Sequence, residues 1–285
     1  MGKLDAIIES FIFSIVILII IPSVLVGIAA SGTLRIPIII ASIIAALLIG
    51  FNVDIINNYS DWNGDIVNGK RKKMHKETSK TELMLVYVFT LLIAIVILYL
   101  INSFYLWIVT ILAVVLGILY SSITKFKDIF PMNHIAMGIG YGVLPFAFGF
   151  FSTSNSASKF ISYYPLILFL FVVCFGYSMT KDYGDIAGDS LYKKNTMPII
   201  FGKSTALKIQ KASIIFAYLL LLAFVLSNLI SSWFLLSLIS LAVAFLIMAH
   251  IGSNNDPAVL KKANMYNRIN HLILRMIIII VILLV

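Results

Sequence analysis

The stretch Ile36–Asp65, IPIIIASIIAALLIGFNVDIINNYSDWNGD, joins a long apolar run to an acidic end. About 20 consecutive apolar residues are enough for a helix to cross the hydrocarbon core of a membrane. After this run, Asn57, Asp61 and Asp65 recur every four residues. On a helix, that spacing places three oxygen-bearing side chains on one face. The stretch therefore predicts a membrane-spanning helix whose polar end carries an acidic site.

A second acidic stretch, DYGDIAGD, covers residues 182–189 and has carboxylates at Asp182, Asp185 and Asp189. Its intervals of three and four residues again favour one helical face. One such cluster is most simply explained as a solvated helix end. Two clusters, each at the end of a long apolar run, favour a shared function.

The composition predicts an all-α integral membrane protein that forms a single polytopic domain over residues 1–285. The chain is 61% hydrophobic and 12% charged, whereas about a quarter of the residues in a soluble domain are charged. Lipid offers no partners for free backbone groups, so such a chain must span the membrane as helices. The net charge of +9 is assigned to basic cytoplasmic loops, and no nucleic-acid partner is expected.

Apolar runs predict about nine transmembrane helices around a central cavity. Nearly all of the 21 basic residues and all 12 acidic residues then fall on the side that holds the N-terminus. An excess of Lys and Arg marks the cytoplasmic side, so we expect a multi-pass protein of the cell membrane whose active site faces the cytoplasm. The long loops 58–82 and 181–205 are expected to be partly helical and to cap the cavity. The predicted spans are 11–30, 36–57, 83–102, 104–123, 133–151, 161–180, 206–227, 232–252 and 268–285.

Magnesium is the ion that suits these clusters, because Mg²⁺ prefers oxygen ligands and is usually held by a few carboxylates together with substrate phosphates. A metal-bound diphosphate is a good leaving group, since the charge that develops on it is already matched. An apolar cavity below the metal would hold a hydrocarbon chain. The residues therefore predict ionisation of a prenyl diphosphate. The predicted metal ligands are Asn57, Asp54, Asp61, Asp65, Asp182, Asp185 and Asp189, and the predicted catalytic residues are Asp61, Asp65, Asp185 and Asp189.

Taken together, these residues resemble the UbiA-type intramembrane prenyltransferases over roughly residues 36–227. The family's N-D-x-x-D-x-x-x-D motif is matched by Asn57, Asp61 and Asp65, and its D-x-x-D-x-x-x-D motif is matched within 182–189. The resemblance implies nine transmembrane helices, dependence on Mg²⁺ and transfer of a prenyl chain from its diphosphate to an acceptor. Further matches are the segment 196–203, Tyr120 with Lys125 and Asn133, and Lys72 in place of a common arginine. The expected substrate-binding residues are Asn57, Asn58, Lys72, Tyr120, Lys125, Asn133 and Lys181.

Two features depart from the family pattern. Asn58 stands where the first motif has an aspartate, and Asp54 lies one turn earlier on the same face. We hypothesise that Asp54 supplies part of the missing charge. The alternative is that Asp54 is a helix-buried residue paired with a lysine. The first span also lacks the arginine that many relatives carry there, which bears on acceptor recognition.

Three functions are weighed for the chain. The first is transfer of a geranylgeranyl group to geranylgeranylglyceryl phosphate, as in the family's archaeal ether-lipid branch. The second is prenylation of an aromatic quinone precursor. The third, from another class, is a cation or substrate transporter. A transporter would carry ionisable groups near the bilayer midplane, whereas the acids here gather at one surface. The expected partners are prenyl diphosphate, a lipid or aromatic acceptor and membrane lipid.

Overall fold

A computed structural model describes residues 2–9, 15–67 and 71–285, and the predicted all-α membrane fold is confirmed within these ranges. The described chain contains eight helices that are long and apolar enough to cross a membrane. A shorter apolar helix covers Val16–Ser31, which is the described part of the first predicted span. Residues 11–14 of that span lie outside the described residues. The eight helices cover Ile36–Asn63, Lys80–Ile101, Phe104–Ile123, Met132–Thr153, Tyr164–Tyr183, Met197–Leu226, Ser232–Ser253 and Pro257–Leu284.

The first half of the chain supplies the helices around the first acidic motif. In chain order they are α1 (Gly2–Glu9), the π-helical segment η1 (Val16–Ile20), α3 (Ile21–Ser31), α4 (Ile36–Val67), α5 (Lys72–Glu77), α6 (Lys80–Ile101), α7 (Phe104–Ile118), the π-helical η2 (Leu119–Ile123), the 3₁₀ turn η3 (Phe126–Asp128), α8 (Met132–Met137), the π-helical η4 (Gly138–Val143) and α9 (Leu144–Thr153).

The second half of the chain begins after the C-terminal end of α9. Its elements are α10 (Ala157–Ser162), α11 (Tyr164–Ser178), α12 (Thr180–Tyr183), α13 (Ile186–Leu191), α14 (Met197–Leu226), the 3₁₀ segment η5 (Ser232–Ser237), α15 (Leu238–Ser253) and α16 (Pro257–Leu284). The loop 181–205 is partly helical, as predicted, because α12, α13 and the start of α14 lie within it.

Helix starts follow the local chemistry of the chain. Ser79 accepts a hydrogen bond from the Glu82 amide while the Glu82 carboxylate accepts one from the Ser79 amide, a capping box that begins α6. Asp256 caps α16 through the amide of Ala258, and Pro257 occupies the first helical position, where its missing N–H costs nothing. These polar caps satisfy the amides that a helix leaves free at its beginning.

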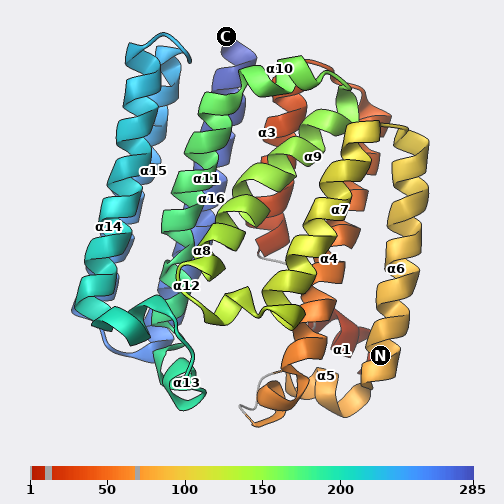
Figure 1. Ribbon diagram of the computed structural model, residues 1–285, viewed down its shortest axis with the longest axis vertical. Helices are drawn as coiled ribbons and strands as arrows, with labels where there is room; N and C mark the ends of the chain where they lie inside the picture. The colour runs from red at the N-terminus through yellow and green to blue at the C-terminus, as the bar shows by residue number, and fades with distance from the viewer. Residues whose placement is uncertain (1, 10–14, 68–70) are drawn as a thin grey trace.

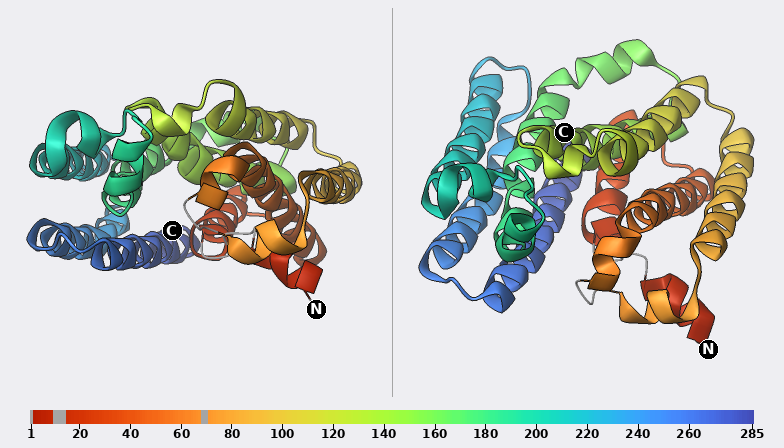
Figure 2. Two further views of the ribbon diagram at one scale, coloured as in Figure 1. Left: turned by 90° about the horizontal axis from the view of Figure 1, so that it is seen from below. Right: turned by 60° about the horizontal axis from the view of Figure 1, so that its bottom comes forward.

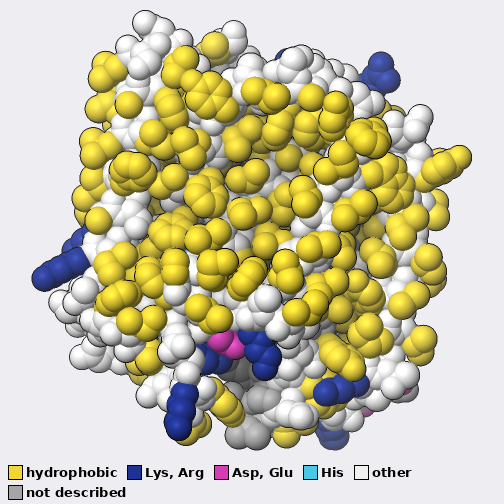
Figure 3. Space-filling view, viewed as in Figure 1, with side chains coloured by type: hydrophobic (Ala, Val, Ile, Leu, Met, Phe, Trp, Pro, Cys, Tyr) yellow, Lys and Arg dark blue, Asp and Glu magenta, His cyan; other side chains and the backbone are white. Residues whose placement is uncertain are grey.

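The two acidic loops lie at the same end of the molecule, as the charge pattern predicts. Figure 1 shows α5 and α13 at one end, and α10 and the C-terminus at the other. Hydrophobic side chains cover the middle and upper part of the face in Figure 3, while most of the visible Lys and Arg side chains lie along its lower part. The two ends therefore differ in polarity, and the end with α5 and α13 is the polar one.

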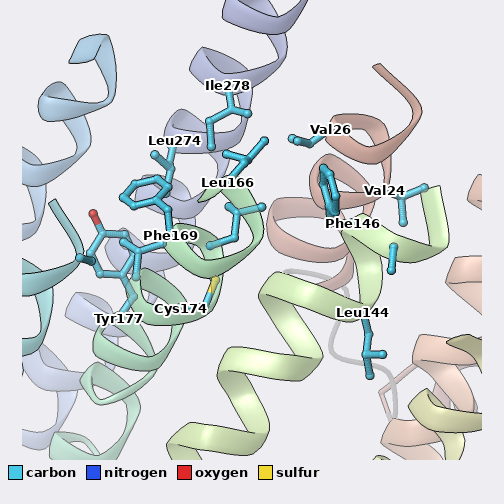
Figure 4. Close-up of a cluster of buried hydrophobic side chains, with 14 of the residues drawn as sticks. Val24, Val26, Leu144, Phe146, Leu166, Phe169, Cys174, Tyr177, Leu274 and Ile278 are labelled. Atoms are coloured by element: carbon cyan, nitrogen blue, oxygen red, sulfur yellow. The ribbon is translucent and has the colours of Figure 1, made fainter. Parts of the chain in front are cut away.

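The core is built where α3 crosses α9 and where α11 packs between η4 and α14. Figure 4 shows how Val24 and Val26 of α3 lie beside Phe146 of α9, while Leu166 and Phe169 of α11 point toward α16. At the α3–α9 crossing, a Cβ added to Gly149 would lie 1.9 Å from the Val24 carbonyl oxygen. The two backbones therefore approach as closely as only a glycine allows.

Gly149→Ala is expected to lower the free energy of unfolding by about 1–3 kcal/mol, because the methyl group meets backbone that cannot move aside. The measurement is the apparent unfolding temperature of the detergent-purified protein. Gly252→Ala is the matched control, since the nearest atom to its added Cβ would be Leu207 Cδ1 at 3.8 Å. Equal unfolding temperatures for the two variants would contradict this account of the crossing.

Candidate active site

A cavity of about 390 Å³ lies among the described helices and joins a polar end to an apolar interior. The polar end is lined from α4, η3 and the α12–α13 region, and the interior from α3, α4, α7 and α9. Ala46 of α4 lines the apolar part and lies fifteen residues before Asp61. At 1.5 Å per helical residue the cavity reaches about 22 Å along α4. That depth suits an extended hydrocarbon chain.

The first acidic motif presents Asp54, Asn57 and Asp61 to the cavity from one face of α4. The ammonium group of Lys127 lies between the last two, 3.1 Å from Asn57 Oδ1 and 2.6 Å from Asp61 Oδ1. Lys127 is largely buried, with 9% of its side chain exposed. The motif thus already holds a positive charge between two of its oxygens.

The π-helical turn η2 brings the fourth predicted span against α4. Ser60 Oγ donates to the Ser121 carbonyl oxygen at 2.6 Å, and Ser121 Oγ donates to Asn57 Oδ1 at 3.3 Å. A π turn contains an extra residue and so rotates the residues that follow it. Beyond this turn Lys125 has a left-handed backbone and is exposed, whereas Lys127 enters the cavity.

The second acidic motif faces the first across the cavity, because Asp185 and Asp189 line it as well. Asp189 Oδ2 accepts a hydrogen bond from Thr196 Oγ1 at 3.1 Å, and its Oδ1 lies 3.4 Å from Lys194 Nζ. Lys194 also pairs with Asp128 at 3.1 Å. The charges of both motifs therefore alternate in sign around the polar end.

Two backbone hydrogen bonds hold the loop after η3 beside the loop after α13. The Phe130 amide donates to the Asn195 carbonyl at 2.8 Å, and the Asn195 amide donates to the Asp128 carbonyl at 2.9 Å. This contact is a short parallel bridge between Ile129 and Asn195. It places Lys194 where it reaches a carboxylate on each loop.

Burial affects the two charged groups of this loop pair differently. Burial of Asp189 raises the pKa of its carboxyl group above the ordinary value, and the charge of Lys194 offsets only part of that increase. Burial of Lys194 lowers the pKa of its amine, but Asp128 and Asp189 outweigh that effect and the pKa is raised. Lys194 therefore stays protonated, while Asp189 takes up a proton at higher pH than an exposed aspartate does.

Asp182, the first carboxylate of the second motif, is buried and bound by protein groups. Its Oδ1 lies 3.1 Å from Lys181 Nζ, and its Oδ2 lies 3.2 Å from His134 Nε2 and 3.3 Å from Asn133 Nδ2. His134 Nδ1 in turn contacts Ser178 Oγ at 2.8 Å. Asp182 lines the cavity, but these contacts give it a role in positioning Lys181 and the end of α11.

Asp182→Asn is expected to lower both stability and activity, whereas Asp185→Asn, at an exposed position, should lower activity alone. Removing the Asp182 charge leaves Lys181 and His134 without their carboxylate. Breaking a fully buried pair costs about 3–5 kcal/mol. Because 28% of the Lys181 side chain is exposed, we expect a loss of about 2 kcal/mol.

The measurement is the unfolding temperature of both variants together with their rate of diphosphate release. A drop in unfolding temperature for Asp185→Asn as large as that for Asp182→Asn would show that the two carboxylates do not differ in this way.

Most of the residues predicted for the site surround this one cavity. Those that line it are Asp54, Asn57, Asp61, Tyr120, Lys181, Asp182, Asp185 and Asp189. The side chain of Asp65 lies outside the described part of the structure. The others are elsewhere: Lys72 and Lys125 are exposed, and Asn58 and Asn133 are fully buried and do not line the cavity. Direct substrate contact by those four therefore stays a prediction, and Asn133 lies against Asp182 instead.

Sequence reasoning missed several polar residues that line the cavity. Lys127 follows the π turn, and no sequence period predicts the rotation that this turn causes. Thr196 belongs to the family-like segment 196–203, but nothing in the sequence indicated its hydrogen bond to Asp189. The remaining residues are Arg71, Asp128, Tyr141, Lys194, Asn264 and Arg268. The last two lie on α16, which begins eleven residues before the predicted span.

The donor set suits Mg²⁺ that is shared with a substrate. Among the described residues no three His, Cys, Asp or Glu side chains gather closely enough to hold a metal alone. Mg²⁺ needs fewer protein ligands, since it retains waters and takes phosphate oxygens. The Lys127 ammonium between Asn57 and Asp61 shows that these oxygens accept a cation. The residues present therefore fit the ion when a diphosphate completes its coordination.

Residues 17–270 match the UbiA prenyltransferase family. The chain belongs to that family. The predicted prenyltransferase class is thereby confirmed, and the transporter alternative loses its support. A comparison with curated protein sequences finds no significant match.

Solved structures of UbiA relatives share the fold. A digeranylgeranylglyceryl phosphate synthase structure is 19% identical, with each chain covered fully and a TM-score of 0.73. An apo UbiA homologue from Aeropyrum pernix K1 is 18% identical, covers 89% of this chain and 94% of its own, and has a TM-score of 0.73. A UbiA homologue from Archaeoglobus fulgidus bound to GPP and Mg²⁺ is 14% identical, covers 97% and 100%, and has a TM-score of 0.66.

Proposed function

We propose that this UbiA family member transfers a geranylgeranyl group from its diphosphate to geranylgeranylglyceryl phosphate in a reaction that requires Mg²⁺. The observation that carries the proposal is the cavity that joins carboxylates of both acidic motifs to an apolar interior and reaches about 22 Å along α4. The archaeal homologue bound to GPP and Mg²⁺ supports the metal and the diphosphate. The synthase structure with the same fold supports the acceptor class.

In this proposal Asn57, Asp61, Asp185 and Asp189 would hold Mg²⁺ together with the diphosphate, and Asp54 would add charge one turn away. When bound, Mg²⁺ neutralises the negative charge that develops on the leaving diphosphate. The predicted compensation of Asn58 by Asp54 agrees with the placement of Asp54 on the cavity wall and of Asn58 away from it. Asp65 remains a predicted ligand.

The chain's own cations complete the binding of the diphosphate. Lys127 and Lys194 would donate to phosphate oxygens, since each reaches the polar end from a different loop. The Tyr120 hydroxyl lines the same region. Fixed donors that surround the leaving group lower the barrier because they need no rearrangement as the bond breaks.

The transfer itself breaks the C1–O bond of the donor and forms a C–O ether bond to the acceptor hydroxyl. Diphosphate leaves with the bonding electrons of the first bond and takes up the proton that the hydroxyl gives up. The apolar walls exclude water, which would otherwise capture the prenyl group. We also propose that the polar end faces the cytoplasm, because it carries most of the basic loops.

The test is an assay of the purified protein with labelled geranylgeranyl diphosphate, with or without Mg²⁺, and with two acceptors. Geranylgeranylglyceryl phosphate represents the proposed reaction and 4-hydroxybenzoate represents the aromatic alternative. We expect an ether-linked product only with the glyceryl phosphate and only with Mg²⁺. Transfer to 4-hydroxybenzoate alone would assign the aromatic reaction. Neither transfer nor release of diphosphate would overturn the proposal.

A further inference from the structure

The stretch 264–275 of α16 carries an unusual number of polar residues for a membrane-spanning helix. Ionisable side chains in such helices are costly and generally mark functional sites. In this helix they share a stripe, because intervals of three and four residues return to one face. Beyond the exposed Lys261 and Lys262, the Asn, His and Arg residues of this stretch are Asn264, Asn267, Arg268, Asn270, His271 and Arg275.

Two asparagines of α16 are bound to neighbouring helices. Asn267 Nδ2 donates to the Tyr177 carbonyl oxygen at 2.9 Å, which connects α16 to α11. Asn270 accepts from Ser240 Oγ at 2.9 Å and donates to the Ser240 carbonyl at 3.0 Å, which connects α16 to α15. Both asparagines are buried. Neither is available to a ligand.

Arg275 connects α16 to α3, η4 and α11. Its guanidinium donates to the Tyr141 carbonyl at 3.0 Å and to Cys174 Sγ at 3.1 Å, and it also donates to Ser23 Oγ. It contacts His271 Nδ1 at 2.9 Å. On the same helix, Leu274 points toward the α11 side chains (Figure 4). These contacts fix the rotation of α16 about its axis.

Asn264 and Arg268 are the two polar residues of the stretch 264–275 that line the cavity. They lie one turn apart, so both side chains face the same region. Arg268 lies seven residues before Arg275, which is about 10 Å along the helix toward the polar end. Because the other polar residues anchor α16, the direction of Arg268 into the cavity is set by the fold.

Arg268 reaches the cavity from a different helix than the acidic motifs do. Helix α16 packs against η1 and α3, whose Val16, Ile20 and Val24 give the cavity an apolar wall. The acidic motifs lie on α4 and around α13, and the views in Figure 2 show α4 and α16 on different sides of the polar end. An arginine and an apolar wall thus adjoin one another on elements other than those that carry Lys127 and Lys194.

We propose that Arg268 and Asn264 form a subsite for the anionic headgroup of the acceptor, a phosphate monoester on a hydrocarbon chain. The inference rests on the proposed function and specifies where its second substrate binds. A guanidinium is always charged and offers a planar pair of donors that match phosphate oxygens. The Asn264 amide adds a further donor, and the apolar wall of η1 and α3 takes the chain. The subsite would also provide an arginine for acceptor recognition, a residue that the first predicted span lacks.

The kinetic test compares Arg268→Gln with Lys262→Gln, which removes one positive charge from an exposed position on the same helix. Loss of a charged hydrogen bond corresponds to about a ten- to hundredfold change. We therefore expect the KM for geranylgeranylglyceryl phosphate to rise by that factor in Arg268→Gln. The KM for geranylgeranyl diphosphate should stay within about twofold of wild type, and Arg268→Lys should recover part of the loss.

A binding test separates this subsite from the diphosphate site and from the proposed reaction. A monoalkyl phosphate is titrated into the protein without Mg²⁺ or donor, and binding is followed by the change in intrinsic fluorescence. Arg268→Gln should weaken binding about tenfold or more, whereas Asp61→Asn should not. Unchanged binding in Arg268→Gln, or a donor KM that rises as much as the acceptor KM, would overturn the subsite. Absence of all transfer by wild type would reject the proposed function, and the binding result would still decide this inference.

Discussion

Asp61→Asn is expected to lower kcat/KM for prenyl transfer about a hundred- to a thousandfold, the loss that follows removal of one preorganised charge contact to a leaving group. Asp61 lines the polar end of the cavity and accepts the Lys127 ammonium at 2.6 Å. An asparagine retains the shape and one acceptor oxygen but loses the charge that attracts Mg²⁺. The measurement is the initial rate of transfer from labelled geranylgeranyl diphosphate over a range of Mg²⁺ concentrations.

The control for this variant is Asp256→Asn, which removes a carboxylate outside the cavity, where asparagine caps a helix equally well. It should transfer at the wild-type rate. Retention of a tenth or more of wild-type activity by Asp61→Asn at every Mg²⁺ concentration would show that Asp61 does not hold the metal.

Ala46→Phe is expected to shorten the donor that the enzyme accepts. Ala46 lines the apolar interior, so the added ring should occupy the region where the far end of a long prenyl chain lies. Crowding of this kind costs about 1–3 kcal/mol, so kcat/KM for geranylgeranyl diphosphate should fall about tenfold. The value for the shorter geranyl diphosphate should change little. The measurement is the ratio of the two kcat/KM values.

Ile44→Phe is the control for cavity filling, because Ile44 lies on the same turn of α4 but is exposed on the outer surface. Its ratio of the two kcat/KM values should equal that of wild type. An equal fall for both donors in Ala46→Phe would show general damage to the fold and would contradict the proposed depth of the chain-binding region.

The arrangement of the two motifs could be predicted because it depends on few physical quantities. The length of the apolar runs predicted the spans, and the bias of basic residues placed both acidic loops at one end of the molecule. The spacing of acidic-motif residues such as Asn57, Asp61 and Asp185 predicted two polar helix faces that meet at one cavity. The structure places both loops at that end and brings these residues to one cavity. Such features follow from the composition of the chain and the spacing of its residues, and both can be read from the sequence.

The residues that sequence reasoning missed are placed by backbone details that no repeating sequence pattern reveals. The π turn at η2 directs Lys127 into the cavity and leaves Lys125 outside. Arg268 was predicted at the edge of a span, but α16 begins at Pro257 and carries it well inside the helix. Within α14, Gly202 has a φ of 75° and interrupts the regular helix, so residues 197–201 form a separate helical turn before the predicted span that starts at 206. Backbone irregularities and early helix starts are set by tertiary packing.

The backbone bridge between Ile129 and Asn195 has a consequence for how the protein is made. The ribosome delivers Asp61 and Lys127 before any of the second motif, so the first half can neutralise Asp61 with its own lysine. Asp128 can form its ion pair only after Lys194 has been synthesised, more than sixty residues later. The bridge then forms only when both halves have been inserted. A nascent chain therefore acquires a closed polar end late in its synthesis, and a truncated product that ends before residue 194 would lack it.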